Sequence, residues 1–195
     1  MHQYEQPTDL PPVAAARVVF VRQKAFVEHC VKQLNDHQFF TELYPGLNSV
    51  GVIMQHLAGN MLSRWTDFLS LDGEKDWRDR ESEFARPAGD PRTARRGIEA
   101  VWEDAWATLY TALTAAENAP PNQTVRIRGV PHSIPMALAR QLDHYGFHIG
   151  QIATIARGLV GTEHWQWFTV APGGSREFNQ SLGYDTDDGG RAARD

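Results

Sequence analysis

The chain has 195 residues, a formal net charge of −5 and a sequence pI near 5.9. Hydrophobic residues make up 42% of it and charged residues 22%, the balance of an ordinary soluble globular domain. An acidic chain has no overall positive field to attract nucleic acid or anionic membranes, so neither is expected as a partner. The length predicts one domain, over residues 1–182, followed by a polar tail over 183–195.

The single cysteine and the apolar segments bear on location. Cys30 cannot form an internal disulfide, which favours a reducing compartment, and its apolar neighbours indicate a small buried hydrophobe rather than a nucleophile. The N-terminal sequence MHQYEQPTDLPP has no basic region followed by an apolar run, so no secretory signal is expected. Charged residues interrupt every apolar stretch well short of the roughly 20 residues that span a bilayer. We therefore expect a cytoplasmic protein without a membrane partner.

Four segments have the apolar spacing that is typical of amphipathic helices. In chain order they cover residues 13–37, residues from Asn48 or Ser49 to the sequence LDGE at 71–74, residues 92–117, and residues from Ser133 to about 159. Either Asn48 or Ser49 could cap the second helix, and Ser133 is the expected cap of the fourth.

The connections between these helices differ in character. Residues 72–96 are rich in charge and broken by Gly and Pro, which predicts a long connection, pinned to the body by Trp77 and Phe84. The alternating sequence TVRIRGV at 124–130 predicts a short strand. The aromatic segment after Gly161 is expected to pack in an irregular conformation. Four long helices with a long crossover between the second and third predict an all-α four-helix bundle, antiparallel or crossover.

The sequence HYGFH places two histidines, His144 and His148, four residues apart on the fourth predicted helix. Residues at this spacing lie on one helix face with Cβ atoms about 6 Å apart, so both imidazoles can bind one cation with metal–nitrogen distances of about 2.0–2.1 Å. Both lie at the edge of the apolar stripe, where they could also be packing residues. The motif lacks the glutamate of HExxH, which excludes the zinc-protease reading.

A third histidine, His56, lies in the middle of the second predicted helix, again at the edge of an apolar stripe. At that depth it could complete a three-histidine site, and three ligands would leave a coordination position open for water or substrate. The other histidines are less suitably placed; they are His2, His29, His37, His132 and His164. Spacing alone leaves both interpretations open, metal ligands and packing residues.

Three segments, SVGVIMQHLAGNMLSRW, DGEKDWRDRESEF and RGVPHSIPMALARQLDHYGFHIGQIATIAR, resemble the DinB/YfiT-like superfamily, and most closely an uncharacterised bacterial subgroup of it. The resemblance covers roughly residues 13–180. It implies an up-up-down-down four-helix bundle of DinB/YfiT-like type with a divalent metal bound by His56, His144 and His148. Homodimers are common in that superfamily, so a homodimer is expected.

The resemblance also implies a range of functions. Characterised relatives include S-transferases and isomerases that depend on low-molecular-weight thiols such as bacillithiol or mycothiol, and others resemble metal-dependent hydrolases. We therefore expect a metal-dependent enzyme that activates a thiol or water, with a small-molecule substrate and zinc or nickel as the ion, in detoxification or stress response. The alternative is a non-catalytic, metal-binding dimeric stress or interaction protein, whose site would be closed by a fourth protein ligand.

Further polar residues are candidates for the surroundings of this site. Arg64 and Arg140 could bind a carboxylate of a substrate or thiol cofactor, because a guanidinium group pairs with carboxylates bidentately. Candidates to orient the imidazoles are Asn60, Asp67, Gln141 and Gln151. The run DWRDRESEF is interpreted as a solvated lid or dimer contact, and no residue is assigned as a general base.

Overall fold

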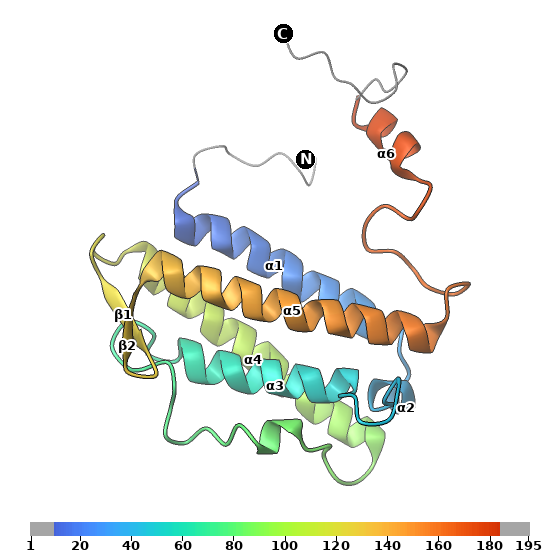
Figure 1. Ribbon diagram of the computed structural model, residues 1–195, viewed down its shortest axis with the longest axis horizontal. Coiled ribbons are helices and arrows are strands. Elements are labelled where there is room, and N and C mark those ends of the chain that lie inside the picture. The colour runs from blue at the N-terminus through green and yellow to red at the C-terminus, as the bar shows by residue number, and fades with distance from the viewer. Residues whose placement is uncertain (1–9, 184–195) are drawn as a thin grey trace.

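The computed structural model describes residues 10–183, which are mainly helical with a small two-stranded sheet (Figure 1). Its elements are α1 Pro12–Val31, α2 Asp36–Phe39, α3 Val50–Trp65, the 3-10 helix η1 Ser82–Phe84, α4 Pro91–Glu117, β1 Thr124–Ile127, β2 Val130–Ser133, α5 Ile134–Val160 and α6 Ser175–Ser181. None of the helices within these residues combines the length and the apolar composition that a membrane span requires. Apart from Gly183, the predicted tail over 183–195 lies outside the described residues.

The four long helices pack in pairs, α1 mainly on α5 and α3 mainly on α4, and contacts between α3 and α5 and between α1 and α4 join the pairs. Helices α1 and α5 run in one direction, and α3 and α4 run in the other (Figure 1). The directions along the chain are therefore up, down, down, up, which differs from the order that the resemblance implied. The antiparallel hairpin of β1 and β2 lies at the end where α5 begins.

The first predicted helix, over residues 13–37, is wrong as a single element. Helix α1 ends at Val31, and the separate short helix α2 follows. The Asn35 side chain accepts a hydrogen bond from the Gln38 backbone N–H at 2.8 Å, and the Gln38 side chain accepts one from the Asn35 N–H at 3.0 Å. This capping box satisfies two backbone donors reciprocally, which favours a new helix start over continuation of the first.

The predicted starts of the second and fourth helices are confirmed. Ser49, rather than Asn48, caps α3 by accepting from the Val52 N–H at 3.3 Å, and Ser133 caps α5 by accepting from the Met136 N–H at 3.3 Å. Helix α3 ends at Trp65, earlier than predicted. The chain then turns through Asp67, whose φ of +50° lies in the left-handed region and is incompatible with a continuing helix.

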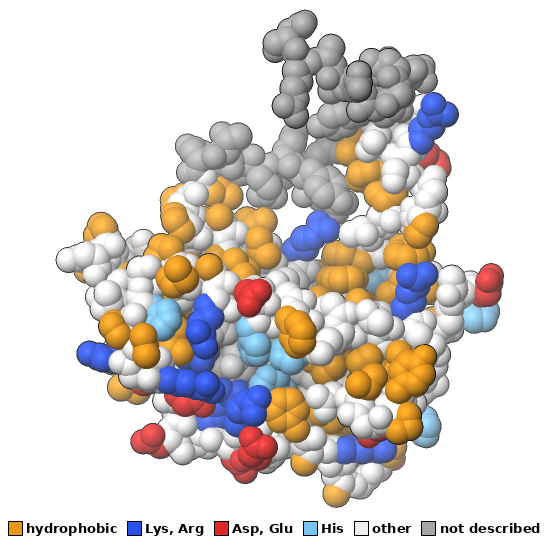
Figure 2. Space-filling model, in the orientation of Figure 1, with side chains coloured by type: hydrophobic (Ala, Val, Ile, Leu, Met, Phe, Trp, Pro, Cys, Tyr) orange, Lys and Arg blue, Asp and Glu red, His pale blue; other side chains and the backbone are white. Residues whose placement is uncertain are grey.

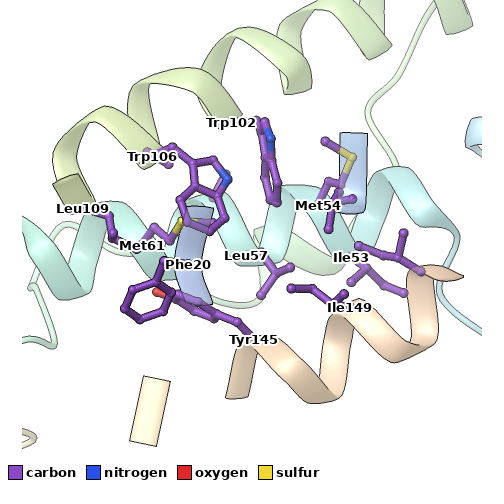
Figure 3. Packing of buried hydrophobic residues seen from close by; sticks show 14 of the residues in the cluster. Phe20, Ile53, Met54, Leu57, Met61, Trp102, Trp106, Leu109, Tyr145 and Ile149 are labelled. Carbon is purple, nitrogen blue, oxygen red and sulfur yellow. The ribbon is translucent and has the colours of Figure 1, made fainter. Parts of the chain in front are cut away.

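The core lies between the four long helices and is rich in large aromatic side chains (Figure 3). Phe20 of α1, Trp106 of α4 and Tyr145 of α5 meet there with edge-on or tilted ring contacts. The Tyr145 hydroxyl accepts a hydrogen bond from Trp65 Nε1 at 2.9 Å, so the buried polar atoms of both side chains are satisfied. With Tyr145 and Ile149 in the core, the histidine pair of α5 lies at the half-buried edge, as predicted.

The long connection between α3 and α4 runs back along α3, and η1 packs against that helix (Figure 1). The prediction that Trp77 anchors this connection is wrong, because 61% of its surface is exposed. The side chains of Arg78 and Glu83 are buried instead, and the Gln55 amide donates hydrogen bonds to backbone carbonyls of residues 82, 83 and 85. Charged side chains can take these places because they pair with each other.

The segment after α5 packs through its aromatic residues, as predicted. It is followed by a short helix that the sequence pattern did not predict. Phe168 stacks on Phe26 of α1, with ring centroids 5.1 Å apart. The His29 ring approaches the carbonyl oxygen of Gln166 at 2.7 Å, so this histidine serves the packing of the C-terminal segment. Helix α6 follows and contributes no buried residue.

Candidate metal centre

Three histidines from two helices meet at the surface of the helical core. The ring centroid of His56 on α3 lies 5.5 Å from that of His144 and 5.0 Å from that of His148, and the two α5 rings are 4.9 Å apart. One nitrogen of each ring lies within 4.8 Å of the other two. Two nitrogens that share an ion at about 2.0–2.1 Å lie within about 4.2 Å of each other, so the spacing is close to that of a bound ion. These three histidines could hold a metal ion.

Regular helix geometry explains why they meet. His144 and His148 are four residues apart on α5, which places them on one face. On the facing helix α3, His56, Asn60 and Arg64 follow at steps of four residues and form a matching stripe. His56 is buried, with 3% of its surface exposed, while the two histidines of α5 are half-buried and reach the solvent.

A buried carboxylate orients the His56 ring. Glu83 Oε2 accepts a hydrogen bond from His56 Nδ1 at 2.8 Å, because a carboxylate can only accept. Arg78 donates to both oxygens of the same carboxylate, from Nε at 2.7 Å and from Nη2 at 2.9 Å. The Phe84 ring stacks on His56 with centroids 4.5 Å apart. His56 Nε2 is thereby left free, and a carboxylate–histidine pair of this kind is typical of metal ligands.

Glu83 was not predicted as part of this site, because it lies in the segment interpreted as a solvated lid or dimer contact. Burial tends to raise the pKa of its carboxyl group, but the hydrogen bonds from His56 and Arg78 outweigh burial and hold that pKa below its ordinary value. Glu83 is therefore ionised, and its charge is balanced by Arg78. No spacing rule relates a 3-10 turn to a histidine 27 residues earlier, so the sequence offered no signal for this contact.

A glycine on α3 makes room for this carboxylate. A Cβ atom at Gly59 would lie 2.4 Å from Glu83 Oε1 and 2.7 Å from its Cδ. Real Cβ atoms do not approach other heavy atoms so closely, so a side chain at this position would push the carboxylate away from the helix. The absence of a side chain at Gly59 is thus part of what places Glu83 on His56.

The two histidines on α5 have different surroundings. His148 Nδ1 lies 2.8 Å from Gln151 Oε1, an acceptor that fixes the proton on Nδ1 and leaves Nε2 free. Burial lowers the pKa of His144 to about 3, with a smaller contribution from its histidine neighbours, and burial also lowers the pKa of His148. Both rings are therefore neutral near pH 7, the form in which imidazole binds metals. Gln151 thus has the predicted orienting position, whereas Asp67 lies beyond the end of α3, away from this site.

A pocket of about 790 Å³ opens over the histidines, and its lining is strongly basic. Five arginines contribute to it: Arg64, Arg78, Arg80, Arg128 and Arg140. The predicted pair, Arg64 and Arg140, is among them, together with the predicted polar residues Asn60 and Gln141 and one carboxylate, Asp143. Figure 2 shows histidine side chains near the middle of this face, with Lys and Arg side chains gathered on one side of them and hydrophobic ones on the other.

The fold and the three-histidine group define a mainly helical protein with a candidate metal site. The sequence matches the model of a family described as a protein of unknown function, DUF1572, over residues 11–174, and the chain belongs to this family. No curated protein and no solved structure matches the chain.

Proposed function

We propose that the chain is a metal-dependent enzyme of the DinB/YfiT-like superfamily that holds one divalent ion between His56, His144 and His148. The observation that carries this proposal is the convergence of one nitrogen from each ring to within 4.8 Å, beneath an open pocket. Imidazole suits zinc and nickel, and we propose one of these as the ion. The four long helices, with one pair antiparallel to the other, suit a four-helix bundle, although their up-down-down-up order differs from the order expected for that superfamily.

The partners of the ligands support a metal site over a packing cluster. Two of the three rings donate their Nδ1 proton, His56 to Glu83 at 2.8 Å and His148 to Gln151 at 2.8 Å. Such partners hold the ring orientation and strengthen the imidazole as a ligand. Histidines that merely pack at a helix edge need not bring their nitrogens together, whereas here one nitrogen of each ring lies within 4.8 Å of the other two.

The open pocket favours an enzyme over a non-catalytic metal-binding protein. Within residues 10–183, the group of ligand atoms contains these three histidines and no fourth histidine, cysteine or carboxylate. A site with three protein ligands keeps a position for water or substrate. A divalent ion there would lower the pKa of a bound thiol or water and so supply a nucleophile near neutral pH. The pocket of about 790 Å³ has the size of small-molecule sites, which suits a thiol S-transferase or isomerase, with a hydrolase as the alternative.

The first test is the metal content of the full chain, purified without a histidine tag or chelator and analysed by mass spectrometry. We expect about one divalent ion per chain in the wild type. His148→Ala should lose the ion, while the control His164→Ala, which changes an exposed histidine of the C-terminal segment, should keep it. Wild-type protein without metal, even after zinc or nickel is added, would contradict the proposal.

A second measurement separates the enzyme from its non-catalytic alternative. Metal-loaded wild type and His148→Ala are compared for consumption of a low-molecular-weight thiol in the presence of an electrophile, and for hydrolysis of an activated ester. The proposal expects acceleration of one of these reactions by the wild type alone. A chain that binds one ion and accelerates neither would support the non-catalytic alternative.

A further inference from the structure

The pocket contains a buried guanidinium group without an acceptor. Arg64 is only 4% exposed, and its Nε and Nη1 atoms are buried with no hydrogen-bond partner among the described residues. Buried polar groups in native proteins are almost always paired, because leaving a buried donor unpaired is costly. Nη2 is not among these buried atoms and Arg64 lines the pocket, so an acceptor from outside the chain could pair with the guanidinium group through Nη2.

Arg64 is held in place rather than free to turn into solvent. A Cβ atom at Gly73 would lie 2.3 Å from Arg64 Nη1 and 2.9 Å from its Cδ, so the backbone of the connection passes directly over this side chain. Ser63 fastens that backbone, because its hydroxyl donates to the Gly73 carbonyl at 3.0 Å and accepts from the Lys75 N–H at 3.2 Å. The guanidinium group is therefore preorganised at the pocket wall.

The charges around the pocket leave two arginines unpaired. Arg78 is paired with Glu83, Arg80 with Glu81 and Arg128 with Glu74. Within residues 10–183, Arg64 and Arg140 form neither an ion pair nor a hydrogen bond. Burial lowers the pKa of Arg64, and the positive charge of Arg140 acts in the same direction, so the two cations are close enough to repel each other.

Three carboxylates act against an anion in this place. Glu74 and Asp72 attract Arg64 electrostatically without a direct contact, and exposed Asp143 lines the pocket. Glu74 is already engaged by Arg128 at 3.1 Å and by Arg78 at 3.5 Å. The lining of the pocket itself has five arginines and one carboxylate, so its wall is positive even before an ion binds the histidines.

We propose that Arg64 and Arg140 form an anion subsite for a carboxylate or phosphate group of the substrate. This inference rests on the proposed function and names the class of its substrate. Arg64 follows His56 by eight residues on α3, a distance of about 12 Å along the helix axis. Arg140 precedes His144 by four residues on the oppositely directed α5, so both arginines lie at the same end of the pocket. The substrate is a small anion that spans about 10 Å between this end and the histidines.

The test measures anion binding to the full chain by calorimetry, with inorganic phosphate and acetate as separate probes. Each probe is used with metal-free and with metal-loaded protein. We expect at least one anion to bind both forms, and the probe that binds identifies phosphate or carboxylate. Arg64→Gln should weaken binding about tenfold or more, because it removes charged hydrogen-bond donors. The control Arg96→Gln, which changes an exposed arginine of α4 outside the pocket, should bind like the wild type.

A second variant keeps the test decisive if Arg64→Gln does not fold. Arg140 is exposed, so Arg140→Gln should fold and bind the anion several-fold more weakly. Anion binding that requires the metal, that is unchanged in both variants, or that is absent from the wild type would overturn the subsite. Metal content tests the proposed function separately. A chain that binds phosphate but no metal would support the anion subsite and contradict the proposed metal-dependent enzyme.

Discussion

The two ends of the pocket differ in how their buried polar atoms are satisfied. At the histidine end (His56, His144 and His148), protein side chains accept from Nδ1 of two rings and leave their Nε2 atoms free. At the arginine end (Arg64 and Arg140), two nitrogens of Arg64 have no partner among the described residues. The amide oxygens of Asn60 and Gln141, between the two ends, are also buried and unpaired. The histidine end therefore offers free ring nitrogens to an ion. The arginine end has unpaired polar atoms that no group of the described residues satisfies.

Two buried arginines make this comparison testable. The Arg78 side chain is 3% exposed and is engaged by Glu83, whereas Arg64 is equally buried and has no acceptor. Removing one partner of a buried ion pair leaves the other charge uncompensated. Removing a charge that has no partner relieves a desolvation cost. The same substitution should therefore have opposite effects at the two positions.

We expect Arg78→Met to lower the free energy of unfolding by about 3–5 kcal/mol, because the buried Glu83 loses its cationic partner. Arg64→Met should raise it by about 1–3 kcal/mol, as is common when a side chain retained for binding is replaced by an apolar one. Urea denaturation of the metal-free protein measures both. If both variants are destabilised alike, Arg64 has a structural role. That result would contradict the difference proposed between the paired Arg78 and the unpaired Arg64.

The carboxylate behind His56 can be tested without removing a metal ligand. Glu83→Gln keeps the size of the side chain but loses the charge that polarises the ring. We expect metal affinity to fall about 10–100-fold, the usual effect of losing an outer partner of a ligand. The control Glu81→Gln changes a neighbouring carboxylate that is 87% exposed and should leave affinity unchanged. Competition with a chromogenic chelator measures these affinities. Equal values for both variants would show that Glu83 does not contribute to metal binding.

The part of the site that was predicted from the sequence follows from interactions between residues that are close together in the chain. The four-residue spacing of His144 and His148 and the caps Ser49 and Ser133 depend only on helix geometry and short-range hydrogen bonds. The apolar stripe of α5 then determines which edge of the helix carries the histidines. These features could be found from periodicity and capping residues, whereas His56 was assigned as the third ligand through the resemblance, and the three histidines do lie together.

The path of the connection between α3 and α4 was not predictable in the same way. Its dense charges normally indicate a solvated segment, so Trp77 and Phe84 were expected to be its anchors, and of the two Phe84 packs, on His56. The structure buries Arg78 and Glu83 instead, because they satisfy each other and His56. Such mutual satisfaction depends on contacts between distant segments, which composition and spacing do not encode. Single-residue clues, such as Gly59 beneath the carboxylate, become informative only when both segments are in place.

Two helical glycines offer a smaller test of the histidine end. Gly59→Ala introduces a Cβ atom 2.4 Å from Glu83 Oε1, while a Cβ atom at Gly97 of α4 meets no atom within 4 Å. Gly97→Ala should stabilise the protein by about 0.5–1 kcal/mol through helix propensity and leave metal affinity unchanged. We expect Gly59→Ala to lose this gain and to weaken metal binding several-fold, because Glu83 is displaced. Thermal unfolding and chelator competition measure the two effects, and improved stability with intact affinity in both variants would show that Glu83 does not depend on Gly59.

A carboxylate fastens the backbone beside the arginine end. Asp72 Oδ1 accepts from the backbone N–H groups of Glu74 and Arg128, both at 2.8 Å, and Oδ2 accepts from that of Gly129 at 2.6 Å. Burial tends to raise the pKa of Asp72, but these three hydrogen bonds outweigh burial and lower it. Asp72 thus joins the start of the connection to the hairpin turn that carries Arg128.

This contact should give the smallest effect and a defined pH dependence. Because the pKa of Asp72 is lower in the folded than in the unfolded chain, its stabilisation is present above the unfolded value of about 3.9 and is lost as the pH falls through the folded value. At pH 7, Asp72→Ala should therefore be less stable than the wild type by less than about 1 kcal/mol, since water screens this half-exposed group. The difference should shrink in urea titrations at pH 3. A difference that stays constant between pH 7 and pH 3 would mean that packing of the side chain, not its charge, holds the turn against the connection.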